Sequence, residues 1–509
     1  MKAIIQALAI APRPRSVAAP AMWPFGSWTP DLANYESPGC TIAENVIPFG
    51  PSGYRPFPGL SAYSTALDAR CQGATSVPGS DGFTYTYAAD ASKLYRLDGT
   101  TATDASKGGG YTLAADEFCD FLKFDNTILA AMPGNAVQGM TIGGSTFADQ
   151  FTSTLKPQCR TMARGGRFLM LGNTNETGTA YPTRVRWGQI DSLVNMDAST
   201  AAQSGFRDID ADGGWIRRMI GGTFVTIFQE RLIQRATYAG PPTVWRFDVV
   251  EKNRGALAPY SVIQLGRLLL YAAHDGFYIF DGQESHPIGD LKVNKFFRDN
   301  ANEDLHFRIT SAIDPANQLA MWAYSSNAVG LTNPDRILLY HWPSGWWAYA
   351  KVDTEWLFDD LSKGTTLDGL DSVNTSIDAL PYSLDSRYWT GGLRSLSAFN
   401  SSHQLATFTG SNLAAKIETA VKAFFPGRRT RIKGVHVLVD GGSPTLAVAS
   451  AQRINDTFTF GSAVAQRAEG YVPLHSTAKY QQFQFNMPSA STWTLAQGLQ
   501  PIAAPMGSR

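Results

Sequence analysis

The stretch YSVIQLGRLLLYAAHDGFYIFDGQESHPIGD, residues 260–290, decides the fold because it contains four short strands joined by tight turns. The runs LLLYAA and FYIF are separated by a turn at Asp275-Gly276, and a second turn follows at Asp281-Gly282. Asp-Gly pairs tolerate the positive φ of a tight hairpin, and aromatic residues suit a pleated surface. The last run, SHPI, contains a proline and therefore belongs on a sheet edge. The stretch predicts one small antiparallel sheet.

The same unit, a turn followed by an apolar strand, recurs along residues 81–324. Its copies are DGFTYTY, DNTILAAM, GGRFLML, GGTFVTIF, LGRLLLYAA and ANQLAMWAY. The turn residues that mark them are Gly82, Asn126, Gly166, Gly222, Gly266 and Asn317, and their spacings are 44, 40, 56, 44 and 51. A multi-strand repeat of about 40–50 residues indicates a β-propeller. The alternative is a large β-sandwich whose hairpins happen to be evenly spaced.

A seventh unit, HQLATFTG, begins at His403, and its Gln404 lies 87 residues beyond Asn317, close to two repeat lengths. We therefore expect an all-β chain with a propeller of six to seven blades over residues 61–410, interrupted by an insertion at about 345–395. Strand patterns such as VHVLVDGG and TLAVAS predict a smaller C-terminal β domain over residues 411–509. Within it, residues 413–425 have helical spacing, with a strand as the alternative. Helix should occupy less than about 15% of the chain.

Residues 1–60 form a predicted N-terminal arm. The first 21 residues have the outline of a signal peptide, but Gln6 interrupts the apolar run and two arginines stand at positions 13 and 15. Residues 23–60 hold seven prolines and seven aromatic residues. Prolines disfavour helix and central strand, so an extended arm is expected outside the regular sheets. Its aromatic residues must be covered by its own body or by a neighbouring subunit.

Composition excludes several functional classes. Lys and Arg total 43, as do Asp and Glu, so no overall basic excess is available to bind nucleic acid, and any DNA contact would depend on local geometry. No apolar run is long enough to span a membrane. The four cysteines lack zinc-site spacing and are expected to be buried thiols in a reducing cytoplasm. They are Cys40, Cys71, Cys119 and Cys159.

Motifs that would carry chemistry are few. Residues 208–213 fit the start of a calcium loop, but Met219 stands where a bidentate glutamate is needed, so a solvated acidic turn is expected. Nucleophile-elbow, P-loop and H-E-x-x-H motifs are absent, and the seven histidines show no metal-ligand spacing. We assign no catalytic, cofactor-binding or metal-binding residue and expect no cofactor and no enzymatic activity. Two clusters remain: four tryptophans within residues 341–356, buried or at an interface, and FPGRRTRIKG at 425–434, a charged strand edge.

Several segments resemble a known family. They are residues 28–60, the run RVRWGQIDSLVNMD, the block from Gly214 through IFDGQESHPIGDLKVNKFF, and LSAFNSSHQLATFTGSNLAAKIET. They are similar to the tail nozzle (tail tubular) and packaged-DNA stabilisation proteins of short-tailed bacteriophages. The resemblance covers most of residues 28–440.

This resemblance implies a virion structural protein that combines a β-propeller with a smaller β domain. As a homohexamer it would form a ring below the head–tail connector, assembled in the bacterial host cytoplasm. Its partners would be head–tail adaptor proteins, tail fibres or spikes, and the double-stranded DNA held in the channel before DNA ejection. Residues 23–60 are then expected to contact the neighbouring subunit. The alternative is a secreted β-propeller that binds or cleaves glycans.

Overall fold

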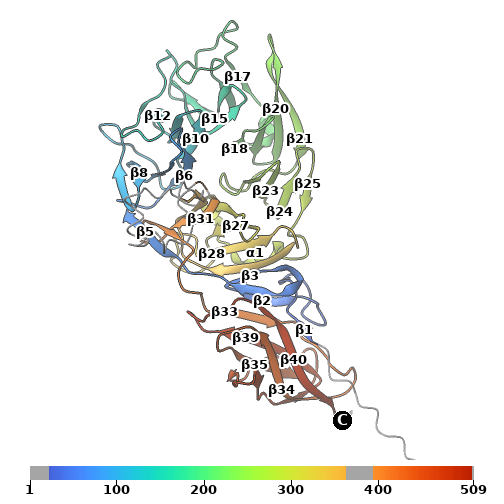
Figure 1. Cartoon of the computed structure of the whole chain (residues 1–509). Helices are drawn as coiled ribbons and strands as arrows, with labels where there is room; N and C mark the ends of the chain where they lie inside the picture. Colours follow the sequence, from blue (N-terminus) through green and yellow to red (C-terminus); the bar gives the residue numbers. More distant parts are fainter. Residues whose placement is uncertain (1–21, 363–391, 393, 507–509) are drawn as a thin grey trace, which may run out of the picture.

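Each strand-and-turn unit folds into a four-stranded antiparallel sheet, and these sheets surround a common axis in the upper body of the molecule (Figure 1). The computed structural model describes residues 22–362, 392 and 394–506. The first five sheets, each given from its innermost strand outward, are β6 (Gly73–Pro78), β7 (Thr84–Ala89), β8 (Leu94–Asp98) and β9 (Thr101–Asp104); β10 (Asp120–Phe124), β11 (Thr127–Ala131), β12 (Gln138–Thr141) and β13 (Ala148–Asp149); β14 (Gln158–Gly165), β15 (Phe168–Glu176), β16 (Thr179–Trp187) and β17 (Gly205–Asp208); β18 (Ile216–Ile220), β19 (Val225–Gln229), β20 (Leu232–Gly240) and β21 (Val244–Lys252); and β22 (Ile263–Leu265), β23 (Leu268–Ala272), β24 (Phe277–Phe280) and β25 (Ser285–Pro287).

Two further units close the ring. They are β26 (Thr310–Asp314), β27 (Leu319–Tyr324), β28 (Arg336–His341) and β29 (Trp346–Lys351), and then β30 (Trp356–Leu361), β31 (Arg394–Phe399), β32 (Gln404–Thr407) and β5 (Ser61–Ala66). Six four-stranded sheets thus stand alone, and the β26–β29 unit is the seventh blade. The all-β propeller prediction is confirmed. The repeat did not reveal that β5, which precedes the first blade in sequence, supplies the outer strand of the last one.

The turn residues that marked the repeat all lie between the first and second strands of their blades. Gly166 and Gly266 adopt φ of +57° and +62°, a left-handed conformation that favours glycine over residues with a Cβ. Helix among the described residues is limited to α1 (Asn294–Asn300) and the 3-10 turns η1 (Gly50–Ser52), η2 (Ala211–Gly213) and η3 (Glu303–Arg308). The low helix content expected from the sequence is therefore confirmed for this part of the chain.

The C-terminal domain is a second body of two packed sheets below the propeller (Figure 1). Its strands are β1 (Trp23–Pro24), β2 (Cys40–Glu44), β3 (Val46–Pro48), β4 (Tyr54–Pro56), β33 (Ala415–Thr419), β34 (Thr430–Val439), β35 (Thr445–Ala451), β36 (Val464–Ala465), β37 (Tyr471–Val472), β38 (Ser476–Ala478), β39 (Tyr480–Met487) and β40 (Ala496–Pro505). One sheet contains β3, β4, β40, β34 and β37, with β1 and β38 beside them. The other, β2-β33-β39-β35-β36, continues directly from blade strand β29.

The predicted arm is wrong in two respects. Prolines did not keep residues 23–60 out of the sheets, because β1 to β4 pair at edges and in short segments. Nor are its aromatic side chains left for a neighbour. Five of them are buried in the chain's own core, and only Tyr35 and Phe49 are exposed. The five are Trp23, Phe25, Trp28, Tyr54 and Phe57.

Three other boundaries are also corrected. The insertion expected at about 345–395 begins too early, since β29 and β30 are blade strands and residues 346–361 belong to the propeller. The remainder of that insertion, and the signal-like residues 1–21, lie outside the described residues. The helical spacing of 413–425 belongs to strand β33, which pairs with β2 and β39 on both sides. Strand β34, which contains most of the basic cluster, is not an edge, because it pairs with β40 and with β37 and β38.

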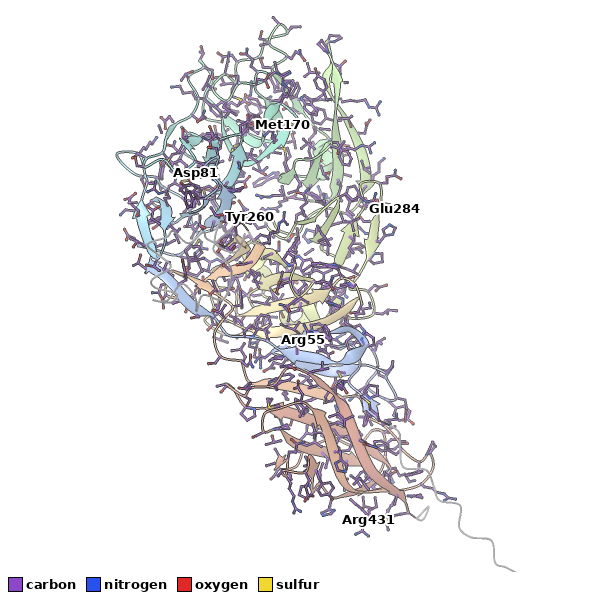
Figure 2. The ribbon with its side chains drawn as sticks, viewed as in Figure 1. Arg55, Asp81, Met170, Tyr260, Glu284 and Arg431 are labelled. Carbon is purple, nitrogen blue, oxygen red and sulfur yellow. The ribbon has the colours of Figure 1, made fainter. Side chains whose placement is uncertain are left out.

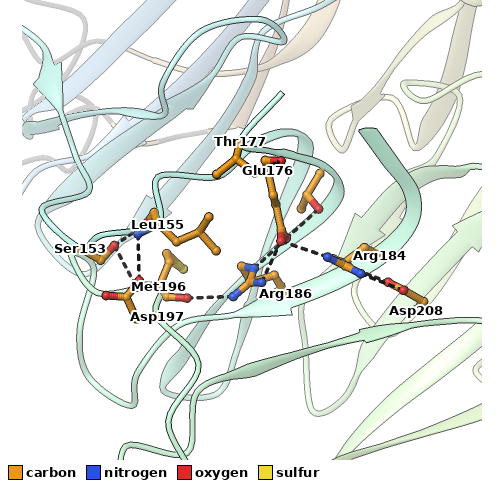
Figure 3. A network of polar contacts seen from close by, with 10 residues as sticks. Ser153, Leu155, Glu176, Thr177, Arg184, Arg186, Met196, Asp197 and Asp208 are labelled. Atoms are coloured by element: carbon orange, nitrogen blue, oxygen red, sulfur yellow. Dashed lines mark hydrogen bonds and ion pairs between the residues drawn. The ribbon is translucent and has the colours of Figure 1, made fainter. Parts of the chain in front are cut away.

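A buried charge network stabilises the third blade (Figure 3). The Glu176 carboxylate accepts hydrogen bonds from Arg186 Nε at 2.7 Å and Arg186 Nη2 at 2.8 Å. It accepts a third from Arg184 Nη1 at 3.0 Å, and Arg184 also binds Asp208 through two bonds of 2.6 and 2.9 Å. Arg186 then donates to the Met196 carbonyl at 2.9 Å. The network ties the long segment between β16 and β17 to the sheet.

Candidate functional site: the propeller axis

The innermost strands of the blades enclose a cavity of about 240 Å³ on the propeller axis. Residues of β6, β10, β18, β22, β26 and β30 all line it, as expected where the first strands of successive blades converge. A second cavity of about 360 Å³ opens at the face where the innermost strands begin. Tyr260, labelled near the middle of the propeller in Figure 2, lines both cavities.

A cluster of four side chains lies at this shared wall. Arg218 from β18 donates to Asp120 from β10, with an Nη1 to Oδ1 distance of 2.6 Å. The Arg218 guanidinium also lies over the Tyr260 ring, 4.5 Å from its centroid. Tyr260 donates to the Cys119 carbonyl at 3.2 Å, and the Trp356 ring packs edge-on against it at 4.6 Å. Three blades and one connecting loop therefore meet at the axis through specific contacts.

The electrostatics of this cluster keep it fixed. Burial lowers the pKa of Arg218, but the neighbouring Asp120 and Tyr260 outweigh it and raise that pKa above its ordinary value. Burial raises the pKa of Tyr260 well above its ordinary value, so the phenol stays neutral. Asp120 is 2% exposed, and its second oxygen accepts from the Met162 backbone N–H at 2.7 Å. A satisfied ion pair beside a neutral phenol positions blades without supplying a proton donor or acceptor near pH 7.

The outer cavity combines aromatic walls with polar groups. Its aromatic residues are Phe118, Trp215, Tyr260 and Phe307, and its polar ones are Asp116, Glu117, Arg160, Asn173 and Arg217. Both arginines are already paired, since Arg160 lies 2.5 Å from Glu117 and Arg217 lies 2.8 Å from Glu230. Trp215 is 51% exposed at the rim. A cavity of this volume, with aromatic surface and few polar groups, has the dimensions of a small-ligand site.

This geometry is better suited to binding than to acid–base chemistry. Glycoside hydrolysis uses two carboxyl groups on either side of the scissile bond. Here Asp116 and Glu117 are adjacent in sequence, and Glu117 is bound to Arg160. Sequence reasoning did not single out Trp215, although its place in DGGWIRR, directly before an innermost strand, is the signal that would have found it.

The groups considered in the sequence are not brought together elsewhere. Among the described residues, no set of three or more His, Cys, Asp or Glu side chains is placed to hold a metal ion. In the acidic turn, the Asp208 carboxylate is bound to Arg184, while Asp210 accepts from the Asp212 backbone N–H at 3.0 Å. Met219, at the position of the missing glutamate, is buried in the core.

The remaining reactive side chains are also accounted for by local contacts. The four cysteines are free and buried, as expected, and burial raises the pKa of each thiol. His403 Nδ1 lies 2.7 Å from the buried Glu355, which accepts from the Cys71 backbone N–H. Of the four tryptophans in residues 341–356, Trp347 and Trp356 are buried, whereas Trp342 and Trp346 are half-buried against the core.

These features define a β-propeller whose axis is closed by an ion pair and aromatic rings, joined to a C-terminal β-sandwich through a shared sheet. Within the described ranges, no helix has the length and apolarity needed to cross a membrane. No known family model and no curated protein sequence matches the chain.

Solved structures give remote similarities. One is the crystal structure of BamB from Moraxella catarrhalis, with 12% identity and a TM-score of 0.35 over 71% of this chain and 92% of that chain. Another is the computationally designed Ika8 protein, with 9% identity and a TM-score of 0.36 over 68% of this chain and 97% of that one. Because both TM-scores are low, the propeller assignment rests on the sheet topology itself.

Proposed function

We propose that this protein is a virion structural protein of a bacteriophage tail, a nozzle or tail tubular subunit. Six copies would form a ring below the head–tail connector, contact adaptor proteins and fibres, retain the packaged DNA and then release it during ejection. The proposal rests first on the sequence resemblance over residues 28–440. It requires a stiff subunit that can serve as one wall segment of a channel.

The observation that carries the proposal is the nine-stranded sheet shared by the two bodies. Strand β2 lies parallel to blade strand β29 at Glu44 and Tyr349, and antiparallel to β33 of the C-terminal domain. The Glu44 carboxylate accepts from Tyr349 Oη at 2.8 Å and lies 2.7 Å from Lys351 Nζ. Continuous backbone pairing prevents hinge motion of the kind that a flexible linker allows. The chain is therefore one elongated unit, as a ring subunit needs.

The closed propeller axis also bears on the path of DNA. The axial cavities have small-ligand volumes, and the Arg218–Asp120 pair lies between the blades. A duplex cannot thread a single propeller of this kind. In the proposed ring, DNA passes between subunits, around the ring's own symmetry axis.

A ring also needs two different contact surfaces on each subunit, because a heterologous interface repeats until the rotation closes. Exposed aromatic side chains occur on two opposite sides of the propeller. Tyr63 and Phe83 lie on the seventh and first blades in ring order, whereas Phe206 and Tyr238 lie on the third and fourth. These surfaces replace the arm as the proposed subunit contacts.

Electron microscopy and native mass spectrometry of the purified chain test the proposal. We expect six-membered rings, and we expect Tyr63→Arg and Phe206→Arg each to dissociate them while the thermal midpoint stays unchanged. Val329→Arg, a fully exposed position in the loop between β27 and β28, is the matched control and should leave rings intact. A chain that stays monomeric at every accessible concentration, alone and with connector proteins, contradicts the proposal.

One observation favours a second candidate, glycan binding by the propeller. The exposed Trp215 ring at the rim of a 360 Å³ cavity offers a flat surface for a sugar ring, beside Asn173 and Asp116. Titration calorimetry against a panel of bacterial surface oligosaccharides tests this candidate, with Trp215→Ala as the variant. Binding that Trp215→Ala abolishes supports it, and absence of heat across the panel rejects it.

A further inference from the structure

The outward face of the C-terminal sheet carries cations. Arg431 and Lys433 project from β34, where they alternate with the buried Ile432. Beside them, β38 exposes Thr477 and β40 exposes Ile502. Among the described residues, the exposed positions of β34, β38 and β40 include no carboxylate. This sheet surface is therefore uniformly positive or neutral.

Two other cations adjoin these strands. Arg428 is exposed in the loop before β34, and Lys479 follows β38, which pairs with the start of β34. We call Arg428, Arg431, Lys433 and Lys479 the basic face. In the described part of the chain, none of the four lies within 4.0 Å of a carboxylate oxygen. Their charges are therefore available to a partner.

The carboxylates of this domain are engaged away from the basic face. Asp440, at the far end of β34, accepts from the backbone N–H groups of Thr494 and Leu495 at 2.8 and 3.0 Å. Glu418 pairs with Lys416 at 2.7 Å, and Asp456 accepts from the Arg453 backbone N–H at 2.9 Å. The positive surface is thus neither neutralised by its own domain nor placed next to an acidic patch.

Charge is also segregated along the molecule. Residues 411–506 hold nine Lys and Arg against four Asp and Glu, whereas the rest of the chain holds 34 against 39. The overall balance of zero conceals this polarity. Figure 2 places Arg431 at the end of the molecule far from the propeller. An anionic partner is therefore attracted to one end of the subunit and mildly repelled by the other.

We propose that the basic face binds the phosphodiester backbone of double-stranded DNA without regard to sequence. Arg, Lys and Thr side chains are the usual phosphate ligands, and no loop or helix projects here to enter a groove and read bases. The choice of duplex DNA over other polyanions rests on the proposed function. About four phosphate contacts per subunit give weak, salt-sensitive binding, which holds a duplex centred while still permitting it to slide.

Fluorescence anisotropy with a labelled duplex, measured on the full chain over a salt series, tests this assignment. We expect the plot of log affinity against log salt to have a slope of about −3 to −4, since each phosphate contact contributes about −0.9. The double variant R431A/K433A should lower the slope by about 2 and weaken binding about 60-fold at 0.1 M salt, because two contacts are lost. The control R246A/K295A removes two exposed cations of the propeller body, both paired with carboxylates, and should change neither value.

Three outcomes overturn the assignment: no DNA binding at low salt, unchanged binding by R431A/K433A, or binding to vesicles of anionic phospholipid in preference to DNA. Both substituted side chains are exposed, so the double variant should keep the wild-type thermal midpoint, which shows that it is folded. Ring formation is scored separately by microscopy. Rings without DNA binding refute the basic face alone, and DNA binding without rings refutes the tail-ring proposal alone.

Discussion

Replacing Glu176 with glutamine removes one charge from a buried network and keeps the side-chain shape. Glu176 is 6% exposed and accepts three hydrogen bonds from two arginines, plus one from Thr174 Oγ1 at 3.1 Å. Without its charge, Arg186, itself 3% exposed, would retain only the Met196 carbonyl as a partner. Breaking a buried pair in this way costs about 3–5 kcal/mol, because an uncompensated charge stays buried.

The expected shift in thermal midpoint follows from this free energy. A propeller of roughly 350 residues has an unfolding entropy of about 0.7 kcal/mol/K, so E176Q should lower the midpoint by about 4–7 °C. The matched control is E230Q, which breaks the Arg217–Glu230 pair, whose side chains are 31% and 25% exposed. That pair should contribute about 1 kcal/mol or less, a shift of about 1 °C. Calorimetry of wild type and both variants at pH 7 makes the comparison.

The same experiment has a defined pH dependence. Burial alone would raise the pKa of Glu176, but hydrogen bonds and charge from Arg186 and Arg184 outweigh it, so the folded-state pKa lies below the ordinary value. The stabilisation is therefore complete above about pH 4.5 and is lost as the pH falls through the folded-state pKa. The gap between wild type and E176Q should shrink in that acidic range. Equal midpoints at pH 7, or a gap that widens with acid, would refute the buried-charge reasoning.

Three further outcomes are expected from calorimetry and thiol labelling. Arg218→Met should lower stability by about 3–5 kcal/mol, because it leaves Asp120 charged and buried, and adding Asp120→Asn should recover part of the loss; an additive double variant would contradict the pairing. Trp28→Ala should cost about 3–5 kcal/mol, whereas the exposed Tyr35→Ala should stay within about 0.5 kcal/mol, and equal effects would argue against the buried arm. The native cysteines should not react with a thiol reagent at pH 8, since burial raises the pKa of Cys40 to about 12 and shields all four, and all four should react in denaturant; rapid native labelling would contradict their burial.

The repeat could be predicted from the sequence because its signal is local. Gly166 and Gly266 occupy left-handed turn positions, and the apolar runs after them are the second strands of their blades. The outer strand of the last blade could not be predicted in the same way. β5 pairs with β32 across more than three hundred residues, and its sequence, SAYSTA, is polar and exposed on an outer edge. Nothing in a local pattern indicates such a partner.

The axial cluster was hidden from sequence reasoning for a similar reason. Asp120, Arg218 and Tyr260 are about a hundred and about forty residues apart, and each occurs in an ordinary strand or loop context. Only ring closure brings them within hydrogen-bonding distance. The exposed Trp215 belongs to the same category, because a tryptophan before a strand is more often core than rim.

The arm shows where a sound premise led to the wrong partner. Its aromatic side chains had to be buried, and they are, but they complete the core of their own C-terminal domain instead of a neighbour's surface. Trp23 packs edge-on against Phe424 and Phe483, and Phe25 packs against Phe485. The C-terminal segment alone therefore lacks part of its core, which residues 23–60 supply from the other end of the chain. Because β2 also bridges β29 and β33, the same segment fixes the two bodies to each other. Contacts between subunits must consequently come from the outer surfaces of the propeller and the sandwich.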